Sequence, residues 1–413
     1  MDLQNEASGS AVTKVINQFP FDFQPYKDVY KQIHSHPELS LHEAETAATI
    51  ASQAAISAYT VHKSIGGHGV AAVLSNGDGP TILLRADMDA LPIEESTGLK
   101  YASKATFTDP EDGSTTAVMH ACGHDMHVTC LLAASAWLAG EEVKKTWQGT
   151  LIVLFQPNEE RGSGANAMVN DGLYKTVPVP DVVLAQHVMP FRAGNVAVRK
   201  GTMVAAADSF KITLFGRGGH GSMPHLCIDP VVLAANVVLR LQGIVAREVD
   251  PTEAAVLTVG SLQESTCGHQ ERILKAMKRI VEKECEASGC EKPPTFEQIR
   301  KFPLTVNDDT VTTKLRNSFA AVFGDSFDPN TVISNASEDV SDLATSVGRP
   351  YCMWFIGGIE HEKWDKAVAN RRIAEDIPVN HGALFAPVIQ PTMETGVKAL
   401  CAAALTHLGR RQC

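Results

Sequence analysis

Short apolar runs that end in charged or imidazole side chains mark the first half of the chain. The runs are 81–84, which precedes Asp87 and Asp89, 151–155, which precedes Glu159 and Glu160, and 182–185, which precedes His187. Continuous aliphatic runs of this length, separated by helical stretches such as 128–138, predict strands buried on both faces of a mostly parallel sheet. Ligands of open α/β sheets bind beyond the carboxyl ends of the strands. We therefore expect these side chains to converge on one functional site.

The pattern changes from about residue 200. Alternating or apolar stretches predict strands, and amphipathic stretches predict helices, of which 270–285 has an apolar stripe along one side. The strand candidates are 209–215, 254–262 and 295–304, and the helix candidates are 229–246 and 270–285. Short apolar runs such as 351–356 then return. We expect an α/β domain formed by 1–198 and 307–413, with a smaller α+β domain, 199–306, inserted into it.

Composition and charge exclude several classes of protein. The 413 residues carry a net charge of −11, which argues against a nucleic-acid binder, and 44% hydrophobic with 20% charged residues is ordinary globular usage. No stretch approaches the ~18 consecutive apolar residues of a membrane span. The first twenty residues lack the features of a secretory signal, so we expect a cytoplasmic protein. Nine cysteines without a C-x-x-C pair indicate reduced thiols.

The segment HACGHDMH at 120–127 is the densest cluster of chemically capable side chains. It places five potential metal ligands or proton carriers in eight residues, Cys122 and His124 among them. A thiolate with imidazoles suits zinc or a similar transition metal. A helix N-terminus with polar caps and a Cys–His catalytic pair are the alternatives. The acidic strand ends nearby favour the metal site.

Carboxylates follow two of the predicted strands. Glu159 and Glu160 are adjacent, and on an extended chain such neighbours point in opposite directions, so that one can ligate a metal while the other holds a proton. A solvated loop is the alternative interpretation of this pair. Asp87 and Asp89 share one face of a strand and could ligate a metal, orient ligand histidines, or cap the loop.

The glycine-rich segment GRGGHG at 216–221 matches the dinucleotide-binding pattern G-x-G-x-x-G and follows a predicted strand. Prolines delay the next helix, however, and no acidic residue ends a strand about twenty positions later. We interpret the segment as a turn that presents His220 and His225, for which a turn role and a substrate contact both remain open. His381 stands alone, so spacing favours a structural role, and the other histidines, His34 included, have no local context.

Taken together, these motifs resemble the M20 metallopeptidase family, specifically the amidohydrolase branch that contains hippurate hydrolase, N-acyl-amino-acid hydrolases and plant auxin-conjugate hydrolases. The matching segments follow the order of the family along most of the chain. They are HSHPEL at 34–39, RADMDALP at 85–92, HACGHDMH at 120–127, FQPNEE at 155–160, QHV at 186–188, GGHGSMPH at 218–225 and SED at 337–339.

The resemblance implies a site with two divalent metal ions. The implied ligands are Cys122 as a bridging thiolate, His124, Glu160, His187 and His381. It thereby assigns His381 to the metal site and places Asp87 and Asp89 behind the ligands. Two dications bring four positive charges and the thiolate and carboxylate remove two, so the centre stays positive and can attract an anionic substrate. Zinc is favoured, and manganese or cobalt also suits these ligands.

The same resemblance implies a reaction. Glu159 would act as general base in hydrolysis of the amide of a small N-acyl or N-aroyl amino acid, His220 would stabilise the oxyanion, and His225 would contact the substrate. The inserted domain would be a lid that also forms a homodimer, and neither nucleic acid nor membrane is expected as a partner. A non-catalytic metal-binding homologue and a dipeptidase or carboxypeptidase of the same superfamily are the alternatives.

One segment departs from the family pattern. After Gln263 about twenty residues of the family are absent, and 264–270 leads directly to the next helix. We expect the inserted domain to lack an internal strand, which puts its stability, dimerisation and substrate contacts in question. Asn158, where the family usually has Ala, and the Gly after His381 are smaller departures that remove no ligand.

Overall fold

The computed structural model describes residues 3–56, 59–250, 255–259, 265–267 and 270–410. The chain divides into two compact units. The first contains Met1–Met203, Val306–Val332 and Asp339–Cys413, and the second contains Val204–Thr305 and Ile333–Glu338. The second unit therefore consists of two separate stretches of chain, and both are inserted in the sequence of the first unit.

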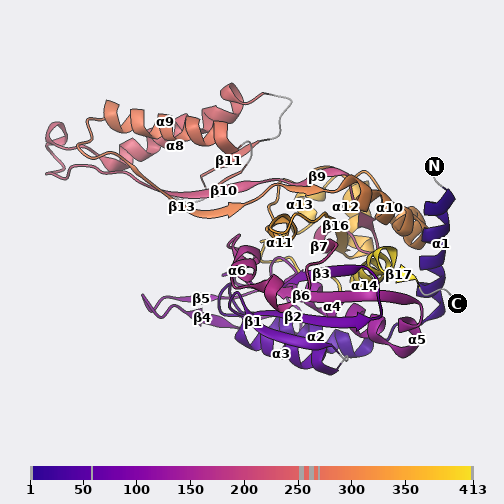
Figure 1. The fold of residues 1–413 in the computed structure, drawn as a ribbon. Helices are drawn as coiled ribbons and strands as arrows, with labels where there is room; N and C mark the ends of the chain where they lie inside the picture. Colours follow the sequence, from indigo (N-terminus) through magenta and orange to yellow (C-terminus); the bar gives the residue numbers. More distant parts are fainter. Residues whose placement is uncertain (1–2, 57–58, 251–254, 260–264, 268–269, 411–413) are drawn as a thin grey trace. The chain divides into compact units, whose positions relative to one another are not determined.

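A mixed sheet forms the centre of the first unit (Figure 1). Its strands, in spatial order, are β1 (Thr60–Ile65), β2 (Gly69–Asn76), β6 (Trp147–Gln156), β3 (Thr81–Asp87), β7 (Val182–Arg192), β16 (Tyr351–Ile359), β8 (Val196–Ala197) and β15 (Phe327–Asp328), with β17 (Gly409–Arg410) paired to β6. The four central strands, β6, β3, β7 and β16, run parallel. All five residues of 151–155 are fully buried, as expected for a strand covered on both faces. The predicted α/β fold class is confirmed.

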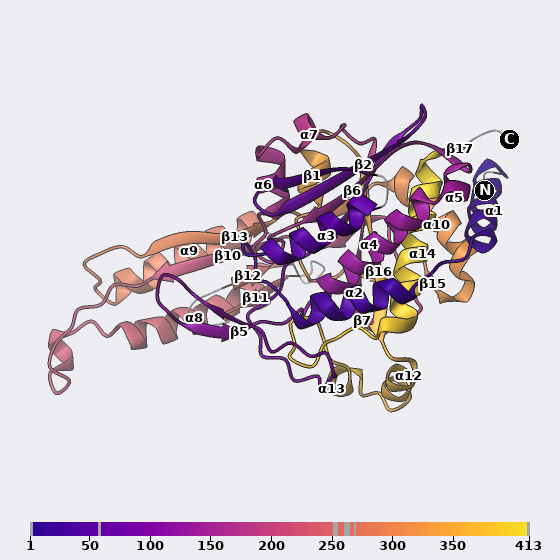
Figure 2. The ribbon, with the colours of Figure 1, turned by 90° about the horizontal axis from the view of Figure 1, so that it is seen from below.

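Helices cover this sheet. Helix α4 (His124–Ala139) lies against β3 and has α2 (Gln24–Ser35), α3 (Ala44–Ile56) and α14 (Ile389–His407) as neighbours (Figure 2), while α1 (Leu3–Gln18) packs on α10 (Asp309–Phe323). The shorter helices are α5 (Glu141–Lys144), α6 (Gly164–Asn170), α7 (Leu173–Thr176), α11 (Ser341–Thr345), α12 (His361–Ala369) and α13 (Ile373–Asp376), and β4 (Thr106–Thr108) pairs with β5 (Thr115–Ala117). Almost every residue of α4 is buried, so the helix is covered on all sides rather than amphipathic.

The second unit packs two helices on an antiparallel sheet. The strands lie in the order β11 (Val256–Thr258), β12 (Ser265–Cys267), β10 (Ala207–Thr213) and β13 (Thr295–Phe302), and the helices are α8 (Pro230–Glu248) and α9 (Gln270–Ala287). β9 (Gly201–Val204) and β14 (Thr305–Asn307) form a separate two-stranded sheet. The core of the unit joins residues of α8 such as Leu233 and Leu241 to residues of α9 such as Met277. The apolar stripe in the sequence of α9 is thereby buried in the core of the second unit.

The glycine-rich segment 216–221 does not open a helix. A short 3-10 helix, Pro224–Leu226, follows it, and α8 begins only at Pro230, with the side chain of Asp229 accepting hydrogen bonds from the first turn. The structure therefore has a turn where a dinucleotide site would need a helix N-terminus.

β12 and β10 are the two internal strands of the four-stranded sheet, and β12 has only three residues. β12 pairs with β10 only at Ala207 and Asp208, whereas β13 pairs with β10 along the whole strand. Within the described ranges, Ser209–Thr213 thus have a strand partner on one side only. The predicted loss of a strand after Gln263 concerns residues 264–270, of which 265–267 form β12 and 264, 268 and 269 lie outside the described residues, so the loss stays a prediction.

Candidate metal centre

The five expected metal ligands come from four separate segments of the first unit. Cys122 precedes α4 and His124 begins it, Glu160 follows β6, His187 lies in β7, and His381 lies between α13 and α14. The parallel pairing of β3, β6 and β7 brings their carboxyl ends to one edge of the sheet. Local chain geometry and sheet topology together therefore assemble the cluster.

Gly123 makes the turn between the first two ligands. Its φ of 82° lies in the left-handed region, which glycine adopts without steric cost. A Cβ at this position would stand 2.4 Å from Cγ1 of Val188. Only glycine fits between Cys122 and His124.

The ligand atoms fall into two neighbouring groups. Cys122, Glu160 and His381 have ligand atoms within 4.8 Å of one another, and so do Asp87, His124, His127 and His187. Sγ of Cys122 is 3.5 Å from Nε2 of His187 and Nε2 of His381 is 3.4 Å from Oε1 of Glu160, while the same Glu160 oxygen is 3.8 Å from Nε2 of His124. All five expected ligands therefore meet in one place.

The orientation of the histidine rings suits a metal. Nδ1 of His124 lies 3.2 Å from Oδ1 of Asp89, and Nδ1 of His187 donates to the carbonyl oxygen of Val188 at 2.8 Å, so Nε2 of each ring faces the cluster. Nε2 of His124 and Oε1 of Glu160 are buried and have no hydrogen-bond partner among the described residues. Buried polar atoms nearly always have partners. The lack of a hydrogen bond to these two atoms indicates that this set of donor atoms suits metal ions.

The pKa values show which protons a metal must displace. Burial alone would lower the pKa of His124, but Asp87 and the Cys122 sulfur raise it well above the usual value. Partial burial likewise opposes protonation of His381, while Cys122 and Glu160 raise its pKa to about 11. Burial lowers the pKa of His187, which keeps that ring neutral. Ligation requires neutral imidazoles, so metal binding must release protons.

The expectation that Glu159 and Glu160 lie on an extended chain and point in opposite directions is wrong. The segment is a turn and not an extended chain, because Asn158 adopts a φ of 57° and the amide of Gly162 donates to the carbonyl oxygen of Glu159 at 2.6 Å. Both carboxylates consequently face the same ring: Oε2 of Glu159 is 3.9 Å and Oε1 of Glu160 is 3.8 Å from Nε2 of His124. The roles expected for the pair, metal ligation and proton transfer, must therefore both be carried out within one cluster rather than on opposite faces of the chain.

Two aspartates that follow the apolar run of β3 adjoin the cluster. Asp89 accepts hydrogen bonds from the hydroxyl of Ser40 at 2.7 Å and from the amide of Glu160 at 3.0 Å, besides its contact with His124. Asp87 accepts a 2.7 Å hydrogen bond from the buried guanidinium of Arg85. Asp89 thus holds two ligand-bearing segments in place, as carboxylates behind metal-bound histidines commonly do. Oδ2 of Asp87 lies 3.7 Å from Nε2 of His124, the atom that faces the cluster, so the expected place of Asp87 behind the ligands stays a prediction.

The two remaining candidates belong to the second unit. His220 is exposed, and its Nδ1 lies 2.8 Å from the hydroxyl of Ser222, while His225 is an exposed residue of the short 3-10 helix. Their roles as oxyanion donor and substrate contact stay predictions.

Two functional neighbours escaped the sequence analysis. His34 is fully buried and bonds Asp125, one residue after the ligand His124. Nδ2 of Asn380 donates to the carbonyl oxygens of Cys122 at 3.2 Å and Val188 at 3.1 Å, which ties three ligand segments together. His34 begins a segment of the family pattern, which was a usable signal, whereas the partners of Asn380 lie too far away in sequence to be recognised.

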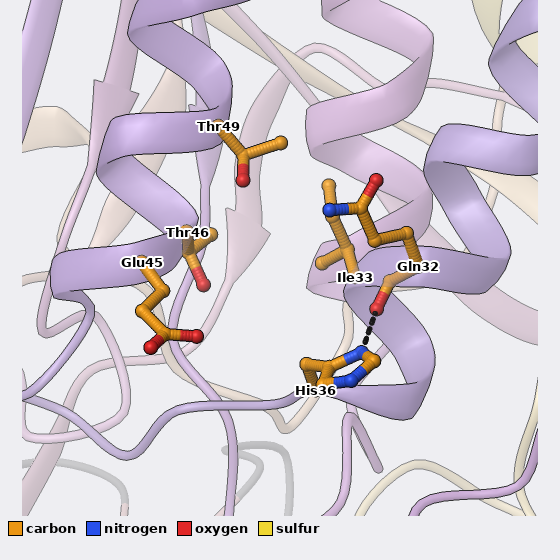
Figure 3. A pocket seen from close by; sticks show the side chains of 6 residues that line it. All are labelled: Gln32, Ile33, His36, Glu45, Thr46 and Thr49. Atoms are coloured by element: carbon orange, nitrogen blue, oxygen red, sulfur yellow. Dashed lines mark hydrogen bonds between the residues drawn. The ribbon is translucent and has the colours of Figure 1, made fainter.

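The first unit also has a surface cavity of about 190 Å³ (Figure 3). Residues of α2 and α3 line it, together with His36, whose ring bonds the carbonyl oxygen of Gln32 at 2.9 Å. None of the candidate metal ligands belongs to its lining. The cavity therefore adds nothing to the chemistry of the metal centre.

Comparisons with known proteins agree with this geometry. Hippurate hydrolase of Campylobacter jejuni subsp. jejuni is 41% identical over 251 residues, which cover 60% of this chain and 61% of that protein. N-acetyl-L-cysteine deacetylase of Bacillus subtilis is 39% identical over 236 residues, 57% of this chain and 53% of that protein. The chain thus spans between half and two thirds of the length of these two curated relatives.

A solved structure and a family model complete the comparison. The YXEP protein of Bacillus subtilis, described as a dinuclear metal binding peptidase from the M20 family, has the same fold with a TM-score of 0.64 at 23% identity, over 92% of this chain and 97% of that one. The model of peptidase family M20/M25/M40 matches residues 83–380, which contain four of the five candidate ligands and end one residue before His381. The family resemblance of the sequence is confirmed, and the chain belongs to peptidase family M20/M25/M40.

Proposed function

We propose that this protein is a dinuclear metal amidohydrolase that cleaves the amide bond of N-acyl or N-aroyl amino acids. The observation that carries the proposal is the meeting of Cys122, His124, Glu160, His187 and His381, with Glu159 beside them. Two buried ligand atoms of this set have no hydrogen-bond partner among the described residues. The names of the hippurate hydrolase and the N-acetyl-L-cysteine deacetylase support the substrate class.

The residues of this chain divide the chemistry as follows. Two divalent ions, zinc in preference to manganese or cobalt, would polarise the amide carbonyl and make a water molecule more acidic when bound. Glu159 takes the proton from the attacking water at its carboxylate and delivers it to the nitrogen of the leaving amine. Asp89 keeps the segments of His124 and Glu160 in register through the hydrogen bonds described above, and Asp87 keeps the place behind the ligands that the resemblance implies. His220 supplies the oxyanion contact that the family resemblance implies.

Replacement of the general base tests the reaction. The chain, loaded with zinc, manganese or cobalt, should hydrolyse hippurate or an N-acetyl amino acid, and Glu159→Gln should abolish hydrolysis while two metals per chain remain. Glu141→Gln makes the same chemical change at an exposed position on α5 and should leave the rate unchanged. Equal rates of wild type and Glu159→Gln would overturn the assignment of the base.

The same assay separates the alternative functions. Two bound metals without turnover of any N-acyl amino acid would indicate a non-catalytic homologue. Preference for substrates with a free α-amino group would indicate a dipeptidase or carboxypeptidase. His220→Ala should lower kcat more than it raises KM if this histidine contacts the oxyanion, because such a contact strengthens only in the transition state.

We also propose that the second unit forms a homodimer. The side of α8 that faces away from the core exposes Val231 (73%), Val232 (58%) and Leu239 (73%), which is unusual for a helix surface. By length and composition α8 could also span a membrane, but residues such as Leu233 and Leu241 along its other side are buried in the core of the unit. Light scattering after size exclusion should give twice the chain mass, and Leu239→Glu should give the monomer mass; a monomeric wild type would contradict the dimer.

A further inference from the structure

His127 occupies a distinctive position at the edge of the metal cluster. It lies on α4, one turn after His124, and its ring is almost fully buried. Nδ1 of His127 is 2.5 Å from Oδ1 of Asp87, and Nε2 accepts a 2.8 Å hydrogen bond from the backbone amide of Val188. A backbone amide can only donate, so Nε2 carries no proton and Nδ1 must carry the one that is given to Asp87.

These contacts separate His127 from the metal ligands. Its ligand atom lies within 4.8 Å of those of Asp87, His124 and His187, so proximity alone would make it a candidate ligand. Nε2 of His124, by contrast, has no hydrogen-bond partner in the described part of the chain. Both nitrogens of His127 are already engaged, and the lone pair that a metal would need is bonded to the Val188 amide.

The Val188 amide needs this partner because of the sheet geometry. β3 pairs with β7 only as far as Arg85 and Ala185, so Val188 lies beyond the last ladder position on that side. Nε2 of His127 accepts the hydrogen bond from the Val188 amide in place of a carbonyl oxygen of a neighbouring strand. Arg85 in turn donates to Asp87 at 2.7 Å, which holds the carboxylate that His127 faces.

Val188 in turn controls a metal ligand. Its carbonyl oxygen accepts the 2.8 Å hydrogen bond from Nδ1 of His187, and this bond leaves Nε2 of His187 facing Sγ of Cys122 at 3.5 Å. We propose that His127 is a positioning residue, whose ring bridges Asp87 and the Val188 amide and so fixes Val188 in the position from which His187 presents Nε2 to the metal. The proposal rests on the proposed function in that it takes His187 as a ligand.

The tautomer of His127 tests the hydrogen bonds directly. In the metal-free chain labelled with ¹⁵N-histidine, the resonances lost in His127→Gln should show a protonated Nδ1 and an unprotonated Nε2 at neutral pH. A ring protonated at Nε2, or at both nitrogens, would overturn the proposal, because neither form can accept from Val188. This measurement depends on neither metal nor activity.

Cobalt affinity tests the positioning role. His127→Leu removes the acceptor and should weaken Co²⁺ binding by about 10- to 100-fold, the usual effect of losing a group behind a ligand, yet it should still bind two ions at saturation with the wild-type absorption spectrum. His127→Gln places an amide oxygen near the position of Nε2 and should restore most of the affinity. Loss of one ion at saturation in both variants would show that His127 is itself a ligand and would overturn the proposal.

A control variant distinguishes positioning from general destabilisation. Leu131→Ala opens a cavity at a fully buried position of the same helix and should lower Tm without changing Co²⁺ affinity. Equal weakening by Leu131→Ala and His127→Leu, or wild-type affinity in His127→Leu, would refute the role. A wild-type chain that binds two cobalt ions without hydrolysing N-acyl amino acids would contradict the proposed function alone, since the affinity comparison does not use turnover.

Discussion

His34 links the segment before the metal centre to two carboxylates, and its charge gives a measurable pH dependence. Its side chain is fully buried, with Nδ1 2.6 Å from Oδ2 of Asp125 and Nε2 3.1 Å from Oε1 of Glu95. Burial alone would lower the pKa of His34, but the hydrogen bonds and charges of the two carboxylates raise it to about 9. The ring is therefore an imidazolium at neutral pH and joins α2 to α4 and to the loop that carries Glu95.

The size of the effect follows from the pKa shift. A rise from 6.5 to about 9 corresponds to about 3 kcal/mol, at about 1.4 kcal/mol for each pH unit. Because the pKa is higher in the folded state, this stabilisation is complete below the unfolded value of 6.5 and is lost as the pH rises through 9. The pKa values of Asp125 and Glu95, which burial would raise, are lowered by His34, so their contribution is lost in acid instead.

Urea unfolding at two pH values tests this reasoning. The free energy of unfolding of the first unit should fall by about 3 kcal/mol more between pH 6 and pH 9.5 in the metal-free wild type than in His34→Gln, which keeps hydrogen-bonding capacity without the charge. His36→Gln, at an exposed position two residues away, should behave as the wild type. The same pH dependence in wild type and His34→Gln would refute a charged His34.

Three further changes have defined outcomes. Arg85→Met removes the buried cation that Asp339 faces at 3.3 Å and should lower the free energy of unfolding by about 3–5 kcal/mol in urea; a loss under about 1 kcal/mol would contradict a charged network. Gly123→Ala forces a side chain against Val188 and into the left-handed region, so Tm and metal affinity should both fall, and a wild-type affinity would show that the turn can relax. Metal affinity should rise from pH 6 to pH 8, because the raised pKa of His381 means that binding displaces its proton; calorimetry in buffers of different ionisation enthalpy measures the release, and pH-independent affinity would contradict it.

The parallel sheet could be predicted because its strands are apolar throughout. The runs at 81–84, 151–155 and 182–185 became β3, β6 and β7, which are neighbours in the sheet, and their carboxyl ends place the acidic and imidazole side chains at one edge. Burial on both faces leaves a signal that survives without any alignment. The helices of the inserted unit were predictable for a similar reason, since the apolar stripe of α9 is regular.

The finer geometry of the centre was not predictable from local sequence. The turn at Asn158 depends on a left-handed residue and on a 2.8 Å hydrogen bond from its amide to Glu43, which is 115 positions away. His34 and His127 likewise acquire their roles from Asp125, Asp87 and Val188, partners that only the folded chain supplies. His381 was placed in the site by family resemblance alone, because its neighbours in sequence carry no ligand pattern.

The presence and position of bound metal ions test most directly whether the five candidate ligands form a two-metal site. Anomalous diffraction from crystals grown with zinc should show two peaks per chain, both within coordination distance of Cys122 and each with further ligands among His124, Glu160, His187 and His381. Anomalous maps without a peak beside Cys122, or with zinc coordinated by His127 in place of His187, would contradict it.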